Sequence, residues 1–131
     1  MHSDHRLRTL VVDAGTVYRW KVRHRNRSGE PARTVLTLHR DGVRTRIVFE
    51  EGPGRVVTGG YWFQGLVGDA DDNHLNLHRP GAVRAFVDET AHRRLLDRHA
   101  DLDGWELLPA AAVRYAAAAT PEAPPDCPRG P

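Results

Sequence analysis

The sequence of 131 residues lacks several features that would assign it to a class at once. Cys127 is its only cysteine, so a framework of intrachain disulfides is excluded, as is usual in a reducing compartment. No apolar run reaches the roughly 18 residues of a membrane helix, and Met1 to Arg8 is polar and charged. We therefore expect a cytoplasmic protein without a membrane partner.

The sequence also lacks the short motifs of common catalytic and cofactor sites. It has no Gly-x-Ser-x-Gly, no His-Glu-x-x-His, and neither of the glycine-rich motifs that cradle phosphates. Cys127 lies in a proline-rich terminal segment, where no base can be held beside it. These absences favour a non-enzymatic protein without a cofactor.

Lysine is nearly absent too, because Lys21 is the only lysine among 19 basic residues. This bias towards arginine is typical of GC-rich bacterial genomes, so we expect a bacterial protein. Arginine enrichment alone then carries little functional weight.

What is present suits one small globular domain. Hydrophobic residues make up 40% and charged residues 27% of the chain, close to the average for folded proteins. A chain of this length buries one core. We predict a single domain over residues 1–119, followed by a disordered proline-rich tail over residues 120–131.

Alternating polar and apolar residues predict strands in the first two thirds of the chain. The clearest stretch is Val17–Arg27, where Tyr18, Trp20 and Val22 share one face. Further strands are predicted at Leu7–Asp13, within Arg55–Leu66 and at His74–His78, and a loop at Gly68–Asn73.

The pair Asp41-Gly42 predicts a β-hairpin, because a type I′ turn needs positive φ at both central positions. It joins Val35–Arg40 to Val43–Phe49. In that register Leu36 faces Ile47 and Leu38 faces Thr45, whereas His39, Arg44 and Arg46 point to the other side.

The hydrophobic period changes to that of a helix after Pro80, and it predicts an amphipathic helix over Pro80–His99. Leu102–Leu108 fits either a short last strand or a segment under the helix, and Ala110–Ala119 has high helix propensity but few apolar anchors. The predicted fold is α+β: a curved, mainly antiparallel sheet of about five or six strands with one amphipathic helix on one face.

Basic residues gather on the polar faces of the predicted strands. Residues 1–60 hold 12 basic and 6 acidic side chains, whereas residues 61–131 hold 7 basic and 11 acidic ones. If the strands share a sheet, they form one basic surface that attracts phosphates or an acidic protein. The candidate binding residues are Arg19, Lys21, Arg23, Arg25, His39, Arg44 and Arg46.

Two other segments are weaker candidates. Tyr61, Trp62 and Phe63 stand between glycines, and three adjacent aromatics expose at least one ring unless both faces of their strand are covered. Asp69 to His78 collects carboxylates and imidazoles, but on a strand His74 and His78 lie about 13 Å apart, too far to share one metal ion. We therefore predict no metal site.

Three hypotheses follow for the function. The first is a small non-enzymatic binding or protein-interaction module with an acidic protein partner. The second is a nucleic-acid-binding domain that uses the basic sheet face. The third is a small metal-assisted enzyme, which requires Asp72, His74 or His78 to meet His24 or His39 in the fold.

Overall fold

The computed structural model describes residues 7–25, 29–57, 65–96 and 98–119, and it confirms the α+β class. One sheet has five strands in the order β1-β2-β3-β4-β8, in which only β8 is parallel to its neighbour, and a small sheet has the order β5-β6-β7. The elements are β1 (Arg8–Asp13), β2 (Thr16–Arg25), β3 (Arg33–Arg40), β4 (Val43–Glu50), β5 (Arg55–Val57), β6 (Leu66–Asp69), β7 (His74–Asn76), α1 (Pro80–His92), β8 (Ala100–Asp103) and α2 (Gly104–Ala119).

The predicted hairpin is confirmed. Asp41 and Gly42 have φ of 53° and 80°, which suits a type I′ turn. Leu36 pairs with Ile47 and Leu38 with Thr45, in the predicted register. Two hairpins, β1–β2 and β3–β4, thus supply four of the five strands of the main sheet.

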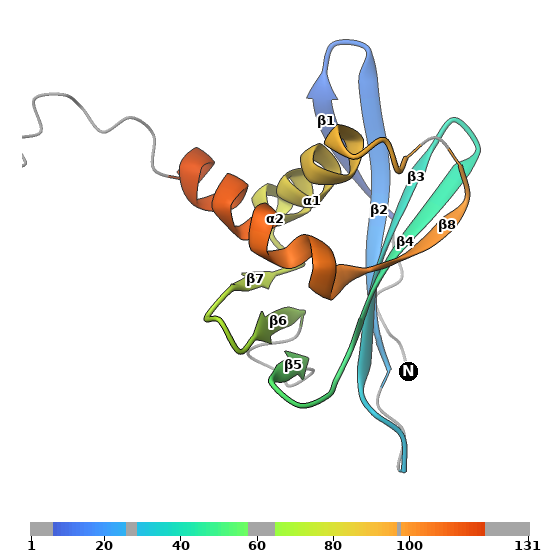
Figure 1. Ribbon diagram of the computed structural model, residues 1–131. Helices are drawn as coiled ribbons and strands as arrows, with labels where there is room; N and C mark the ends of the chain where they lie inside the picture. Colours follow the sequence, from blue (N-terminus) through green and yellow to red (C-terminus); the bar gives the residue numbers. More distant parts are fainter. Residues whose placement is uncertain (1–6, 26–28, 58–64, 97, 120–131) are drawn as a thin grey trace, which may run out of the picture.

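The core lies between the five-stranded sheet and the two helices, which Figure 1 shows on the same side of that sheet together with the small sheet. The strands contribute one alternating face to it. Their buried apolar side chains are Leu10, Tyr18, Trp20, Val22, Leu36, Leu38, Ile47 and Phe49.

Phe49 connects the sheet to both helices. Its ring meets the ring of Phe86 of α1 edge to face at 5.6 Å, and that of Trp105 of α2 at 5.2 Å. The indole Nε1 of Trp105 donates a hydrogen bond of 3.0 Å to the carbonyl of Glu50. These contacts fix α1 and α2 against one face of β4, and no described helix or strand packs on the opposite face, which we call the open face.

The predicted helix over Pro80–His99 is too long, because α1 ends at His92. Arg94 adopts φ of 60°, and its N–H donates to the carbonyl of Ala91 while the N–H of Leu95 donates to that of Thr90. This is a Schellman cap, with arginine where glycine is usual.

Two features were not predicted: a second helix, and a second, smaller sheet. α2 is anchored by Trp105, Leu108 and Ala111, three buried residues at helical spacing. Leu102–Leu108 was predicted as either a short last strand or a segment under the helix. The structure divides it between the end of β8 and the first turn of α2. In the small sheet, β6 takes in Gly68 and Asp69, which were predicted to lie in a loop.

Parts of three predictions lie outside the described residues. They are the predicted tail over residues 120–131, the end of the strand predicted to reach Arg27, and the middle of the segment Arg55–Leu66. Within the described residues, β2 ends at Arg25.

Candidate functional site

The open face of the five-stranded sheet carries most of the predicted binding residues. Strand pairing aligns the side chains of this face in rows across β2, β3 and β4. Arg19 of β2 pairs with His39 of β3, which in turn pairs with Arg44 of β4. In the next row, Lys21 pairs with Thr37, which pairs with Arg46.

All of these side chains except Arg19 line a hollow of about 230 Å³, which we call the basic trough. β3 supplies its floor, because Val35 and Thr37 are short, and Thr37 is only 7% exposed. The longer side chains of β2 and β4 stand on either side. The lining consists of Lys21, Arg23, Arg25, Arg33, Val35, Thr37, His39, Arg44 and Arg46.

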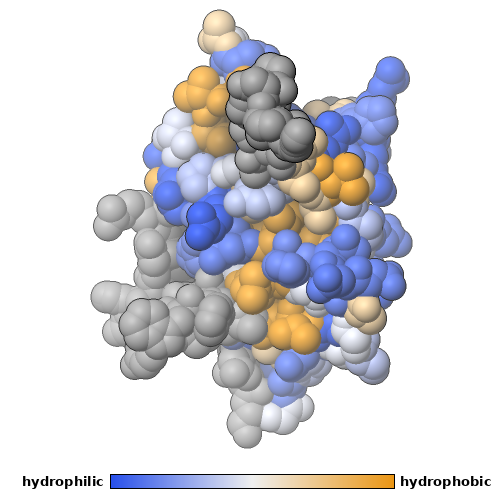
Figure 2. All heavy atoms as spheres, turned by 90° about the vertical axis from the view of Figure 1, so that its left-hand side faces the viewer, coloured by the Kyte–Doolittle hydropathy of each residue, from blue (hydrophilic) through white to orange (hydrophobic). Residues whose placement is uncertain are grey.

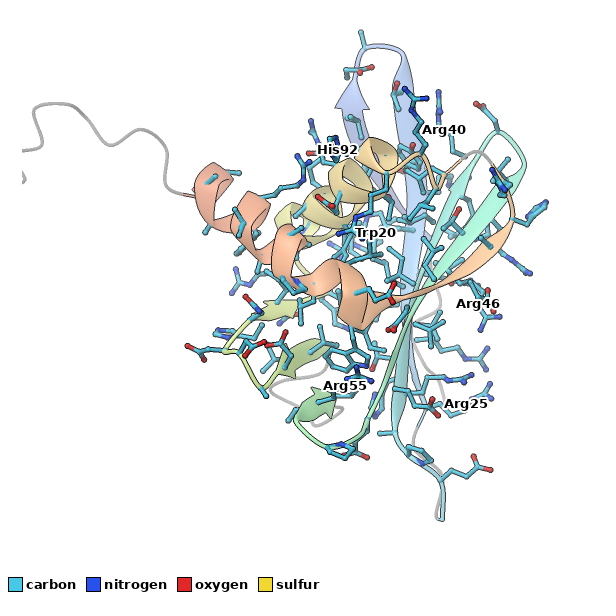
Figure 3. All side chains as sticks on the ribbon, in the orientation of Figure 1. Trp20, Arg25, Arg40, Arg46, Arg55 and His92 are labelled. Carbon is cyan, nitrogen blue, oxygen red and sulfur yellow. The ribbon has the colours of Figure 1, made fainter. Side chains whose placement is uncertain are left out.

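The lining has six cationic side chains and, among the described residues, no carboxylate. Figure 3 shows the side chains of Arg25 and Arg46 on the side of the sheet that faces away from the helices. The carboxylates nearest in the strand register lie at the margin. Glu50 pairs with Arg33, and Asp101 of β8 lies 3.5 Å from Nε of Arg46.

His39 is held neutral by its surroundings. Burial is the largest cause that lowers its pKa, and the positive charges of Lys21, Arg44 and Arg19 lower the pKa further. Near pH 7 the ring therefore offers one N–H donor and one acceptor.

Two buried polar atoms in the lining have no hydrogen-bond partner within the part of the chain that the structure describes. They are Nε2 of His39 and Nε of Arg46. Burying a polar atom without a partner costs about 1–3 kcal/mol, which makes Nε2 of His39 a candidate contact for a ligand. Nε of Arg46 makes no hydrogen bond but has the carboxylate of Asp101 at 3.5 Å, so it can contact a ligand at a smaller gain.

The structure places the seven predicted residues on one sheet face, and six of them line the trough. Arg19 lies in the same face, beside His39, but is not part of the lining. Sequence reasoning missed Arg33 and the floor residues Val35 and Thr37. The hairpin register could have found all three, because they alternate with Leu36 and Leu38 on β3. The role of the seven predicted residues in binding stays a prediction.

The predicted aromatic patch, Tyr61, Trp62 and Phe63, lies outside the described residues. The other described side, turned to the viewer in Figure 2, mixes apolar and polar side chains over the helices and the small sheet.

The acidic segment is explained by loop structure. Oδ1 of Asp69 accepts hydrogen bonds from the backbone N–H groups of Asp71 and Asn73, and the side chain of Asn73 also donates to this carboxylate. Burial raises the pKa of Asp69, but these hydrogen bonds outweigh it and lower the pKa overall. Among the residues described, no three His, Cys, Asp or Glu side chains are grouped to hold a metal ion.

His24 also has a structural partner. Its Nδ1 lies 2.8 Å from Oγ1 of Thr34, a residue with no exposed surface. Burial lowers the pKa of His24, while the charge of Glu51 opposes that shift. A hydroxyl that no substrate reaches cannot act as a nucleophile, so this pair is no catalytic dyad.

None of the described helices is long and apolar enough to cross a membrane. Comparisons with protein-family models, with curated proteins and with solved structures found no significant match to this chain.

Proposed function

We propose that this protein is a non-enzymatic binding module whose basic trough holds the phosphate backbone of double-stranded nucleic acid. One observation carries the proposal: six cationic side chains line one hollow on an open sheet face, and no described carboxylate lies among them. Such a concentration of fixed positive charge attracts a polyanion through counterion release.

The cations repeat at a spacing that suits a chain of charges. Arg19, Lys21, Arg23 and Arg25 alternate along β2, so their Cα atoms follow one another at about 6.8 Å. Guanidinium groups also match phosphate oxygens in a bidentate geometry. A ligand with regularly repeated phosphates fits this arrangement.

The apolar content of the face argues against an acidic protein as the partner. Protein interfaces depend on buried aromatic and apolar anchors at their centre. The described part of the trough offers only Val35 as an apolar lining residue. The aromatic residues of β2, Tyr18 and Trp20, are 5% and 1% exposed and belong to the core.

The same lack of aromatics favours duplexes over single strands. Proteins that bind single strands stack the bases on exposed aromatic rings. The trough has no such ring among the described residues, so it offers contacts to phosphates but none to bases. Backbone contacts of this kind bind without sequence preference.

Fluorescence anisotropy with a labelled duplex of about 20 base pairs tests the proposal. At about 20 mM salt, where the Debye length is about 20 Å, the wild-type protein should bind the duplex. Six neutralised phosphates would give a slope of log K against log salt of about −5. The double variant Arg23→Glu/Arg44→Glu should lose binding while keeping its circular dichroism spectrum.

Arg79→Glu/Arg84→Glu is the matched control, because it changes net charge equally on the helical side. It should bind nearly as well as the wild type. If the wild type does not bind duplex even at about 20 mM salt, the proposal is wrong. Binding to polyglutamate instead would assign the trough to an acidic protein.

A further inference from the structure

Cationic side chains are unevenly spread along the trough. At the Arg44 end of β4, both walls are cationic. Towards the other end of β4, Val48 and Glu50 take the positions that face Val35 and Arg33. Cations on both walls therefore stand opposite each other only around His39 and Thr37, whereas Arg23, Arg25 and Arg33 line the other end from β2 and β3 alone.

Four cations surround this point as the corners of a rectangle. Arg19, which lies beside the trough lining, and Lys21 stand on β2. Arg44 and Arg46 stand on β4, with His39 and Thr37 of β3 between the two pairs. The Cα atoms of the rectangle are about 6.8 Å apart along the strands and about 9.6 Å apart across them. Side chains as long as these can converge on one small anion from both walls.

The two buried nitrogen atoms of the trough without a hydrogen bond among the described residues lie at this same end. They are Nε of Arg46 and, when the ring carries a proton there, Nε2 of His39. The hydroxyl of Thr37 adds a further donor to the floor. Arg46 is only partly compensated, because its carboxylate neighbour, Asp101, has a side chain that is 63% exposed.

We propose that this end of the trough, centred on His39 and Thr37, is a discrete site for a phosphate dianion such as the terminal group of a phosphomonoester. The proposal rests on the proposed function and adds to it that the site prefers the end of a phosphorylated chain. A phosphodiester carries one negative charge, whereas a phosphomonoester carries about −1.5 to −2 and three acceptor oxygens near pH 7. The cluster of donors around His39 and Thr37 therefore matches a phosphomonoester better than a phosphodiester.

The site should also take up a proton with its ligand. The charged groups that face His39 are Arg19 and Lys21 from β2 and Arg44 from β4, all positive. A bound dianion supplies the opposite charge, so it favours the protonated ring and raises the pKa of His39. Sulfate is a suitable probe, because it remains a dianion throughout the range in which histidine titrates.

The first experiment compares two duplexes of about 20 base pairs that differ only in a 5′-phosphate, in the low-salt anisotropy assay described above. The phosphorylated duplex should bind at least about fivefold more tightly, because charge-assisted hydrogen bonds to the extra oxygens are added. Arg44→Ala and His39→Ala should abolish this difference. Arg25→Ala, at the other end of the trough, is the matched control and should retain it.

The second experiment titrates the histidine ring signals by NMR with and without sulfate, and assigns His39 from the spectrum of His39→Gln. Sulfate should raise the pKa of His39 and leave that of His24 unchanged. A calorimetric titration with inorganic phosphate alone then separates a free phosphate ligand from a phosphorylated chain end.

The outcomes separate the two proposals. Equal affinity for both duplexes, with no effect of sulfate on His39, overturns the dianion site and leaves duplex binding intact. If neither duplex binds but inorganic phosphate does, and this binding needs His39 and Arg44, the dianion site is supported and duplex binding is overturned. If no probe binds, both proposals are wrong.

Discussion

The carboxylate of Glu89 links the two helices, and its removal should destabilise the fold. The Glu89 side chain is 7% exposed and lies on α1. Its Oε2 accepts a hydrogen bond of 2.6 Å from Nε of Arg93, and its Oε1 accepts one of 2.9 Å from Nε of Arg114 on α2. In Glu89→Gln the amide keeps one acceptor oxygen, but the charge is lost and the other oxygen becomes an NH2 group that cannot accept a hydrogen bond from an arginine.

The expected cost of Glu89→Gln is about 1.5–3 kcal/mol, the usual worth of hydrogen bonds to a charged group. The larger cost of about 3–5 kcal/mol for breaking a fully buried pair does not apply. Arg93 and Arg114 are each 38% exposed, so water can solvate them in the variant. At about 4 °C for each kcal/mol, the melting temperature should fall by about 6–12 °C.

The pH dependence gives a second readout. Hydrogen bonds from Arg114 and Arg93 lower the pKa of Glu89 below its ordinary value of 4.5. A lowered pKa means that the stabilisation is fully present above the unfolded value and is lost as pH falls through the folded value. The difference between the wild type and Glu89→Gln should therefore be constant from about pH 8 to about pH 5 and shrink in more acidic buffer.

Asp88→Asn is the matched control, because Asp88 pairs with Arg84 on the same helix but is more exposed. It should cost less than about 0.5 kcal/mol. Thermal unfolding followed by circular dichroism measures both variants. If Glu89→Gln costs no more than Asp88→Asn, the carboxylate does not hold the helices together and the reasoning is refuted.

Three backbone predictions are checked by chemical denaturation. Arg94→Gly should stabilise the protein by about 1 kcal/mol, since φ of 60° is strained for arginine; a loss of stability would show that the arginine side chain contributes more than the strain costs. Gly42→Val should destabilise by on the order of 1 kcal/mol or more through backbone strain alone, because no atom lies within 4 Å of an added Cβ; an unchanged midpoint would contradict the turn. Gly104→Ala should cost about 1–3 kcal/mol, because the new methyl group would overlap the ring of Phe49; a stable variant would mean that the ring moves freely.

The sheet hairpins could be predicted because their determinants are local. Asp41-Gly42 fixes the turn, and the alternation on either side fixes which residues face each other. The position of the fifth strand of the sheet, β8, could not be predicted in the same way. β8 is four residues long, and its parallel pairing with β4 depends on where α1 ends and the chain returns.

The predicted end of α1 was wrong and the start of α2 was not predicted, because neither boundary is determined by the hydrophobic pattern. Leu95 continues the apolar spacing of α1, but the backbone reverses at Arg94, so Leu95 packs as part of the cap. The start of α2 could not be predicted from the sequence, because Trp105 could pack into the core from either a strand or a helix. Its helical state follows from contacts with Phe49 and Glu50, which are distant in sequence.

The candidate site shows the same division between local and tertiary information. Alternation along β2 places Arg19 and Lys21 on one face, but it says nothing about what lies beside them. The trough exists because β3, with the short residues Val35 and Thr37, is paired between two strands with long cationic side chains. If β3 exchanged its place with an edge strand, the same residues would form a flat charged face without a hollow. The order of the strands, more than the number of arginines, therefore decides whether this surface can enclose an anion.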